Sequence, residues 1–62
     1  MKYIRKKVLN DIVNEIYDIT DKSIIFDIII KHLEINKIMT SMDELEKWVV
    51  DVFKMKKELL QN

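Results

Sequence analysis

The fold class of this chain depends on the segment SIIFDIIIKHLEI, residues 23–35. Its polar positions are spaced four, four and three apart, so they follow one line of a helix: Ser23, Asp27, Lys31 and Glu34. Asp27 and Lys31 also form an acid-before-base pair at i,i+4, which stabilises a helix. Apolar side chains cover the rest of the helical wheel, and such a helix has to be covered on several sides.

The same segment also has the features of a strand. Its β-branched run is typical of a buried strand or of an aggregation-prone segment. No other segment of the chain is available to pair with it, however, and an isolated strand is not stable. We therefore predict a helix over about residues 21–35. Asp18 or Thr20 is the expected N-cap, and Asn36 the expected C-terminal stop, because Asn tolerates the left-handed conformation better than other residues with a side chain.

A second helix is predicted over about residues 3–19. Its apolar positions include doublets that recur every four residues, as one face of a helix requires: Val8 and Leu9, Ile12 and Val13, Ile16 and Tyr17. Arg5 points into this apolar stripe, where its aliphatic stem can be buried. The basic residues lie at the N-terminal end and the acidic ones at the C-terminal end, which opposes the helix dipole.

The third helix is predicted over about residues 42–61 and has the strongest local signals. Ser41 and Glu44 form a capping box, and acidic residues precede basic ones along the helix, as its dipole favours. Apolar residues spaced alternately by three and four predict a packing seam that further residues widen. We predict that this face contacts a partner or a second copy: Met42, Leu45, Trp48, Val49, Val52, Phe53, Met55 and Leu59. Val50 falls on the opposite side of the wheel, and we expect it to matter little.

These segments predict an all-α fold, a small three-helix bundle or a domain of helical-hairpin type. The 62 residues begin with Met1, and we expect them to form one complete domain over residues 1–62, in which each helix runs antiparallel to the one before. A domain of this size has a small core, and this one has no cysteine for a disulfide. The excess of apolar surface therefore predicts a helical homodimer.

Composition excludes several functional classes. The absence of cysteine excludes disulfide frameworks and zinc–cysteine sites, and the absence of glycine excludes phosphate-binding loops. No segment reaches the roughly 20 apolar residues of a membrane span, and no apolar stretch typical of a signal peptide follows the basic N-terminus. No catalytic constellation is present. We therefore expect a cytoplasmic protein that is not an enzyme and that binds no metal or other cofactor.

Two polar features need an interpretation. The basic cluster of Lys2, Arg5, Lys6 and Lys7 is a candidate contact for an anionic partner, although eleven basic and eleven acidic residues balance in the chain and make nucleic-acid binding a poor expectation. His32 is the single histidine, and no carboxylate or second histidine lies three or four residues away to form a local metal site. We interpret it as a buried or interfacial histidine with one satisfied nitrogen.

The function predicted from these patterns is that of a small protein–protein interaction module. It would act as an adaptor, inhibitor or regulator by docking an apolar helical face on another protein. One alternative is a dimeric DNA-binding transcriptional regulator that uses the basic N-terminus, and another is a structural or scaffolding subunit. Frequent Lys, Ile and Asn, together with the absence of Gly and Pro, indicate an AT-rich genome and favour a phage or virus as the source.

Overall fold

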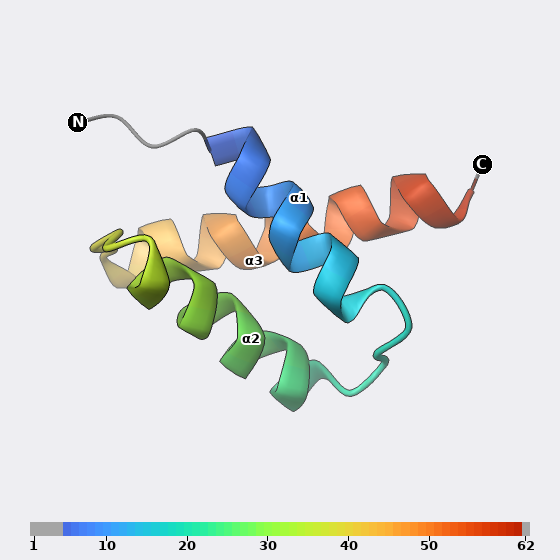
Figure 1. The fold of residues 1–62 in the computed structure, drawn as a ribbon, viewed down its shortest axis with the longest axis horizontal. Helices are drawn as coiled ribbons and strands as arrows, with labels where there is room; N and C mark the ends of the chain where they lie inside the picture. The colour runs from blue at the N-terminus through green and yellow to red at the C-terminus, as the bar shows by residue number, and fades with distance from the viewer. Residues whose placement is uncertain (1–4, 62) are drawn as a thin grey trace.

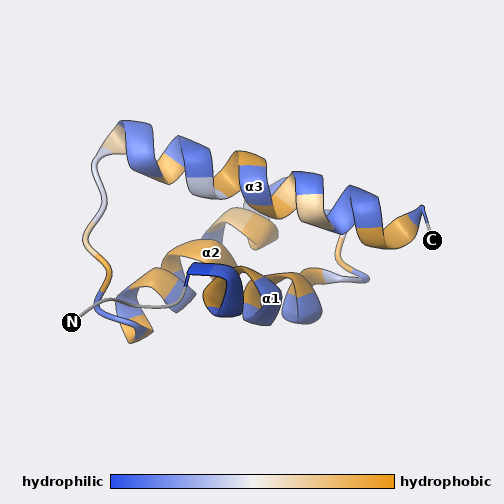
Figure 2. Ribbon diagram, turned by 90° about the horizontal axis from the view of Figure 1, so that it is seen from above, coloured by the Kyte–Doolittle hydropathy of each residue, from blue (hydrophilic) through white to orange (hydrophobic). Residues whose placement is uncertain are grey.

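Three helices make up residues 5–61, the part of the chain that the computed structural model describes: α1 (Arg5–Ile16), α2 (Lys22–Ile35) and α3 (Met42–Leu60). No strand occurs within these residues, so the all-α prediction is confirmed. α1 and α2 run in opposite directions and form one layer, and α3 crosses them as a second layer (Figures 1 and 2). The segment with strand-like composition is therefore helical.

The first connection shows why α1 ends at Ile16, three residues before the predicted end. Beyond this residue the amide of Ile19 donates to the carbonyl of Ile16 at 2.9 Å, and the Ile19 side chain packs against the core. The carbonyl of Ile19 accepts a hydrogen bond of 2.6 Å from Nζ of Lys56 on α3. Contacts with a distant helix thus favour the turn, and the local sequence pattern does not contain them.

The N-cap of α2 is Asp21, so the prediction of Asp18 or Thr20 was wrong. Its Oδ1 accepts from the amides of Ser23 at 2.9 Å and Ile24 at 3.3 Å. A carboxylate in this position satisfies amides that have no partner within the helix, and its charge suits the helix dipole.

α2 ends in a Schellman motif, which turns the chain toward α3. The amide of Lys37 donates to the carbonyl of Glu34 at 3.0 Å, and the amide of Ile38 donates to the carbonyl of Leu33 at 2.8 Å. The residue in the left-handed conformation is Lys37, with φ of 56°, whereas Asn36 is the C-cap with φ of −87°. The predicted stop at Asn36 is therefore confirmed, whereas the left-handed conformation expected there belongs to the next residue, Lys37.

The start of α3 confirms the predicted Ser41 cap. Oγ of Ser41 accepts from the amide of Glu44 at 3.3 Å and lies 3.4 Å from Oε1 of the same residue. The Glu44 carboxylate thus contacts the cap hydroxyl, where a full capping box would place it on the cap amide. Asp43 and Glu44 occupy the first turn and Lys57 the last, as the helix dipole favours.

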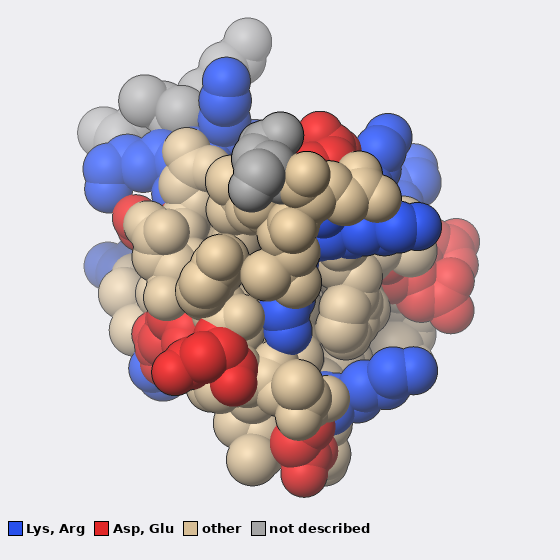
Figure 3. All heavy atoms as spheres, turned by 90° about the vertical axis from the view of Figure 1, so that its right-hand side faces the viewer, with Lys and Arg blue, Asp and Glu red and all other residues tan. Residues whose placement is uncertain are grey.

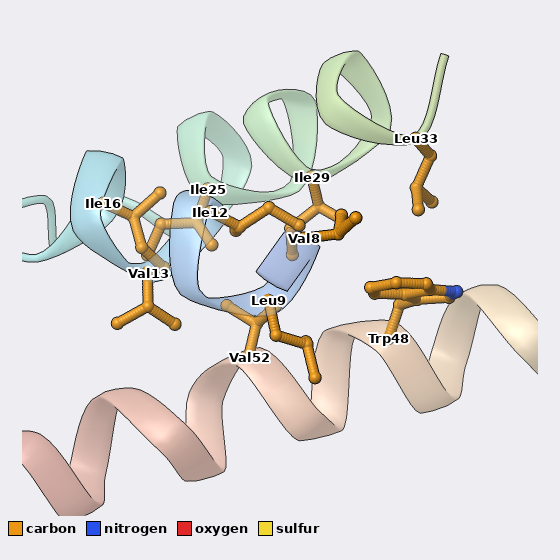
Figure 4. Close-up of a cluster of buried hydrophobic side chains, with 10 residues drawn as sticks. All are labelled: Val8, Leu9, Ile12, Val13, Ile16, Ile25, Ile29, Leu33, Trp48 and Val52. Atoms are coloured by element: carbon orange, nitrogen blue, oxygen red, sulfur yellow. The ribbon is translucent and has the colours of Figure 1, made fainter. Parts of the chain in front are cut away.

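One apolar core joins the two layers. Trp48 and Val52 point from α3 toward the layer of α1 and α2, as Figure 4 shows, and both are almost completely buried. No polar or charged side chain is buried in the described part of the chain. The core consists of Val8, Leu9, Ile12, Val13 and Ile16 of α1, Ile25, Ile29 and Leu33 of α2, and Trp48 and Val52 of α3. The periodicity of α1 predicted its contribution, because each of these five residues belongs to the predicted stripe.

Candidate functional site, an apolar groove with an acidic rim

The structure divides the predicted contact face of α3 into two parts. Trp48 and Val52 belong to the core, and four residues are half-buried against it: Leu45, Val49, Phe53 and Met55. Met42 and Leu59 are exposed, at 78% and 44%. The central part of this face therefore packs into the core of the single chain. Exposed apolar surface remains near the two ends of α3, at Met42 and Leu59.

At the end of α3 that contains Met42, the apolar surface forms a groove between α2 and α3. The groove has a volume of about 380 Å³ and is lined by Phe26 of α2 and by Met42, Leu45, Glu46, Val49 and Val50 of α3. Five of these six side chains are apolar, and Glu46 is the one polar member of the lining. Phe26 is 40% exposed and Val50 62% exposed, so large apolar side chains remain accessible to a binding partner.

A second, more polar hollow continues from this groove over the outer side of α3. It has a volume of about 440 Å³ and shares Glu46 and Val50 with the groove. Its remaining lining residues are Asp43, Lys47 and Asp51. Asp43 and Glu46 therefore place two carboxylates against one ammonium group, that of Lys47, at the rim of the groove, whereas Asp51 is engaged in an ion pair with Arg5.

Two residues of the groove were not identified by sequence reasoning. Val50 was expected to matter little, because it lies opposite the core-facing seam, yet it lines both hollows. Phe26 was treated only as part of an all-round apolar helix. A second series of residues along α3 provides a signal for Val50, because it runs through Glu46, Val50 and Phe53 at spacings of four and three.

A further uncharged surface lies at the end of the molecule where α3 terminates. Figure 3 views this end and shows uncharged side chains over much of its middle, with acidic and basic side chains mainly around them. Leu59 and Leu60 end α3, and Tyr17 follows α1; they are 44%, 57% and 49% exposed. None of these three residues lines either of the two hollows described above.

The predicted basic cluster is partly neutralised by neighbouring acids. Arg5 pairs with Asp51 of α3, and its guanidinium lies 4.0 Å from the centroid of the Trp48 ring, a cation–π contact. Lys7 is exposed and lies 3.4 Å from Asp11. Lys6 is exposed, and Lys2 lies outside the described residues. Arg5 thus links α1 to α3, and Lys6 and Lys7 remain at the surface.

His32 joins α1 to α2 through a carboxylate. Its Nε2 lies 2.8 Å from Oε1 of Glu15, and Nζ of Lys31 lies 2.8 Å from Oε2 of the same residue. The hydrogen bond from Lys31, followed by that from His32, lowers the pKa of Glu15 below its ordinary value of 4.5. These contacts place positive charge beside an acidic residue in the last turn of α1, where the helix dipole opposes it. The His32 side chain is half-buried and lies between two helices, and the predicted single satisfied nitrogen is present.

Residues 5–61 contain no group of three or more potential metal ligands, and none of their helices has the length and apolarity needed to cross a membrane. Comparison with known proteins found no matching family model, no similar curated protein and no similar solved structure.

Proposed function

We propose that this protein is a small, non-enzymatic interaction module that binds an amphipathic helix in the groove between α2 and α3. The observation that supports this proposal is the groove itself, an apolar hollow of about 380 Å³ with the carboxylate of Glu46 in its lining. Grooves of this kind accept the apolar face of a helix, whose side chains at i, i+3, i+4 and i+7 serve as anchors. The protein would act as an adaptor, inhibitor or regulator.

The chemistry of the groove favours a helix over a small molecule. Small-molecule sites combine an apolar lining with several converging polar groups that fix the orientation of the ligand. Glu46 is the single polar residue lining this groove, so little here would orient a small ligand. A helix is oriented by its length and by charges along its flanks, and the rim of Asp43 and Glu46 favours basic flanks on the bound helix.

Self-association is part of the proposal. A domain of this size has a free energy of unfolding of only about 3–9 kcal/mol, at 0.05–0.15 kcal/mol per residue. Exposed Met42, Val50 and Phe26 add apolar surface that a second subunit would remove from water. We also propose a cytoplasmic location and a phage or viral origin, which the amino-acid composition supports.

The DNA-binding alternative has less support. Non-specific affinity for DNA depends on basic side chains that neutralise phosphates. Arg5 and Lys7 each lie beside an acidic residue, and the chain has no net charge. Fluorescence anisotropy with random duplex DNA at physiological salt should therefore give a Kd weaker than about 10 μM, the weaker side of the non-specific range. A tighter, steeply salt-dependent affinity that is lost on replacing Lys6 and Lys7 would favour the DNA-binding alternative.

Site-specific photocrosslinking tests the proposed function. A benzophenone amino acid replaces Val50 in the groove or, as a matched control, the exposed Asn14 on α1, in cells that naturally contain the protein. Mass spectrometry of the adducts should identify a defined protein, or a second copy, from position 50 and not from position 14. Equal adducts from both positions, or none from position 50, would contradict the proposed site.

A further inference from the structure

We propose that the occupant of the groove is α3 of a second copy of this chain, seated antiparallel to the first α3 in a two-fold dimer. This inference rests on the proposed function and specifies the partner and its register. Figure 2 shows α3 as a layer with α1 and α2 on one side only, so its outer side is open to a further helix. A dimer with two-fold symmetry would fill both grooves at once, because each α3 is both the occupant and the wall of a groove.

Residues along the open side of α3, together with Phe53, which is half-buried at the edge of the core, are regularly spaced. Six positions follow one another at intervals of three, four, three, four and three, which is the repeat of a helix–helix seam. These positions are Asp43, Glu46, Val50, Phe53, Lys57 and Leu60. The series has the same intervals in both directions, with its midpoint between Asp51 and Val52. Two such helices in antiparallel orientation therefore match position by position along the whole seam.

In this register the side chains of the second copy complement the groove. It sets the second copy's Phe53 opposite Val50, the second copy's Lys57 opposite Glu46, and the second copy's Leu60 beside Met42 and Asp43. The groove is apolar apart from Glu46, so it would receive two apolar side chains and one cation opposite its one carboxylate. Leu60 is 57% exposed in the single chain, and Lys57 is also exposed, so both are accessible to a second copy.

The distribution of charge selects the antiparallel orientation. In a parallel pair Glu46 would lie opposite Glu46 of the second copy, and Lys57 opposite the second copy's Lys57. Like charges in such positions are destabilising. Glu46 and Lys57 are eleven positions apart in the helix, about 16.5 Å at 1.5 Å per residue, so the two side chains of one chain cannot pair. A Glu46–Lys57 interaction therefore reports contact between copies.

Charge reversal measured by sedimentation equilibrium at low ionic strength tests this register. Glu46→Lys and Lys57→Glu should each weaken dimerisation about tenfold, because each creates two repulsive pairs per dimer. The double variant should restore the wild-type dissociation constant. Glu34→Lys, the same charge change at an exposed position of α2, should leave it unchanged. A double variant no better than the single variants would overturn the register.

The oligomeric state of the wild type and the crosslinks at position 50 together separate failure of this inference from failure of the proposed function, and Val50→Asp tests the dimer directly. Because Val50 is exposed, the variant should keep its helicity while its dimer is lost. A wild-type chain that stays monomeric at millimolar concentration would overturn the dimer. If position 50 then still crosslinks to another protein, the groove functions as proposed but with a different occupant. If position 50 gives no adduct either, both proposals are wrong.

Discussion

The two sides of α3 are both apolar in part, yet they have opposite roles. Trp48 and Val50 lie two positions apart, and they are 1% and 62% exposed. Both belong to series spaced by threes and fours, so spacing alone does not distinguish them, although the series of Val50 also contains charged residues. The difference is that α1 and α2 cover one side of α3 and leave the other open. An apolar stripe becomes core only where a second element packs on it, and the remaining stripe is available for binding.

A charge placed on the covered side should have the largest effect. Ile29 is completely buried, and Ile29→Asp would bury a charge without a partner, at a cost comparable to the whole free energy of unfolding. We expect an unfolded chain by circular dichroism. The matched control on the same helix is Ile24→Asp, because Ile24 is 47% exposed, and it should remain folded. A native melting temperature for Ile29→Asp would contradict the described core.

Truncation of the two α3 side chains tests the comparison directly. Trp48→Ala removes the largest buried side chain and should lower the free energy of unfolding by about 3–5 kcal/mol. Val50→Ala should change the free energy of unfolding of the monomer by no more than about 0.5 kcal/mol. Urea unfolding at a concentration where the chain is monomeric provides both values. Similar losses in the two variants would mean that the outer side of α3 supports the fold as much as the inner side.

Local chemistry explains which parts of the fold were predictable. The doublets of α1 predicted its five buried residues, and the Ser41 cap was readable because the hydroxyl and its amide partner are three residues apart. The identity of residues 23–35 as a helix also followed from the spacing of their polar side chains. Each of these features is decided within one or two helical turns.

Features decided by distant contacts were not predictable in this way. α1 ends at Ile16 in a connection where Lys56 of α3 binds the carbonyl of Ile19. The left-handed residue is Lys37, one position beyond the intrinsically better Asn36, and this register lets Ile38 pack against the core. The groove itself depends on which side of α3 the other helices leave open. Sequence patterns identified the apolar surface but not its division into core and groove.

The connection that directs α3 across α1 and α2 offers a stabilising change. Lys37 has a positive φ, and the left-handed conformation costs a residue with a side chain about 1–2 kcal/mol. Lys37→Gly should remove this strain and, after the larger loss of backbone entropy on folding, raise the free energy of unfolding by about 0.5–1 kcal/mol. Lys37→Ala retains the Cβ atom and should not stabilise. An equal gain in both variants would assign the effect to the lost charge and not to the backbone.

The smallest expected effect is the pH dependence of the free energy of unfolding that Glu15 contributes. Glu15 lies in the layer of α1 and α2, away from the open side of α3. The bonds from Lys31 and His32 lower the pKa of Glu15 in the folded chain below its ordinary value of 4.5. A carboxylate with a lowered folded pKa stabilises the protein fully above the unfolded pKa, and this contribution disappears as the pH falls through the folded pKa. Glu15 should therefore support the fold at neutral pH and lose this role below about pH 4.5.

A comparison of Glu15→Gln with the wild type isolates this contribution. Glu15 is 39% exposed, so solvent screens its ion pairs and the difference in the free energy of unfolding should be less than about 1 kcal/mol at pH 7. The difference should shrink toward zero in acid, because protonation removes from the wild type the same charge that the substitution removes. Glu34→Gln, at an exposed position of α2, controls for the general loss of one negative charge.

Val50→Ala in either background should not alter the pH dependence, since Val50 lies on the uncovered side of α3. A pH-dependent interaction between positions 15 and 50 would mean that the two sides of the molecule are coupled, contrary to the separation described above.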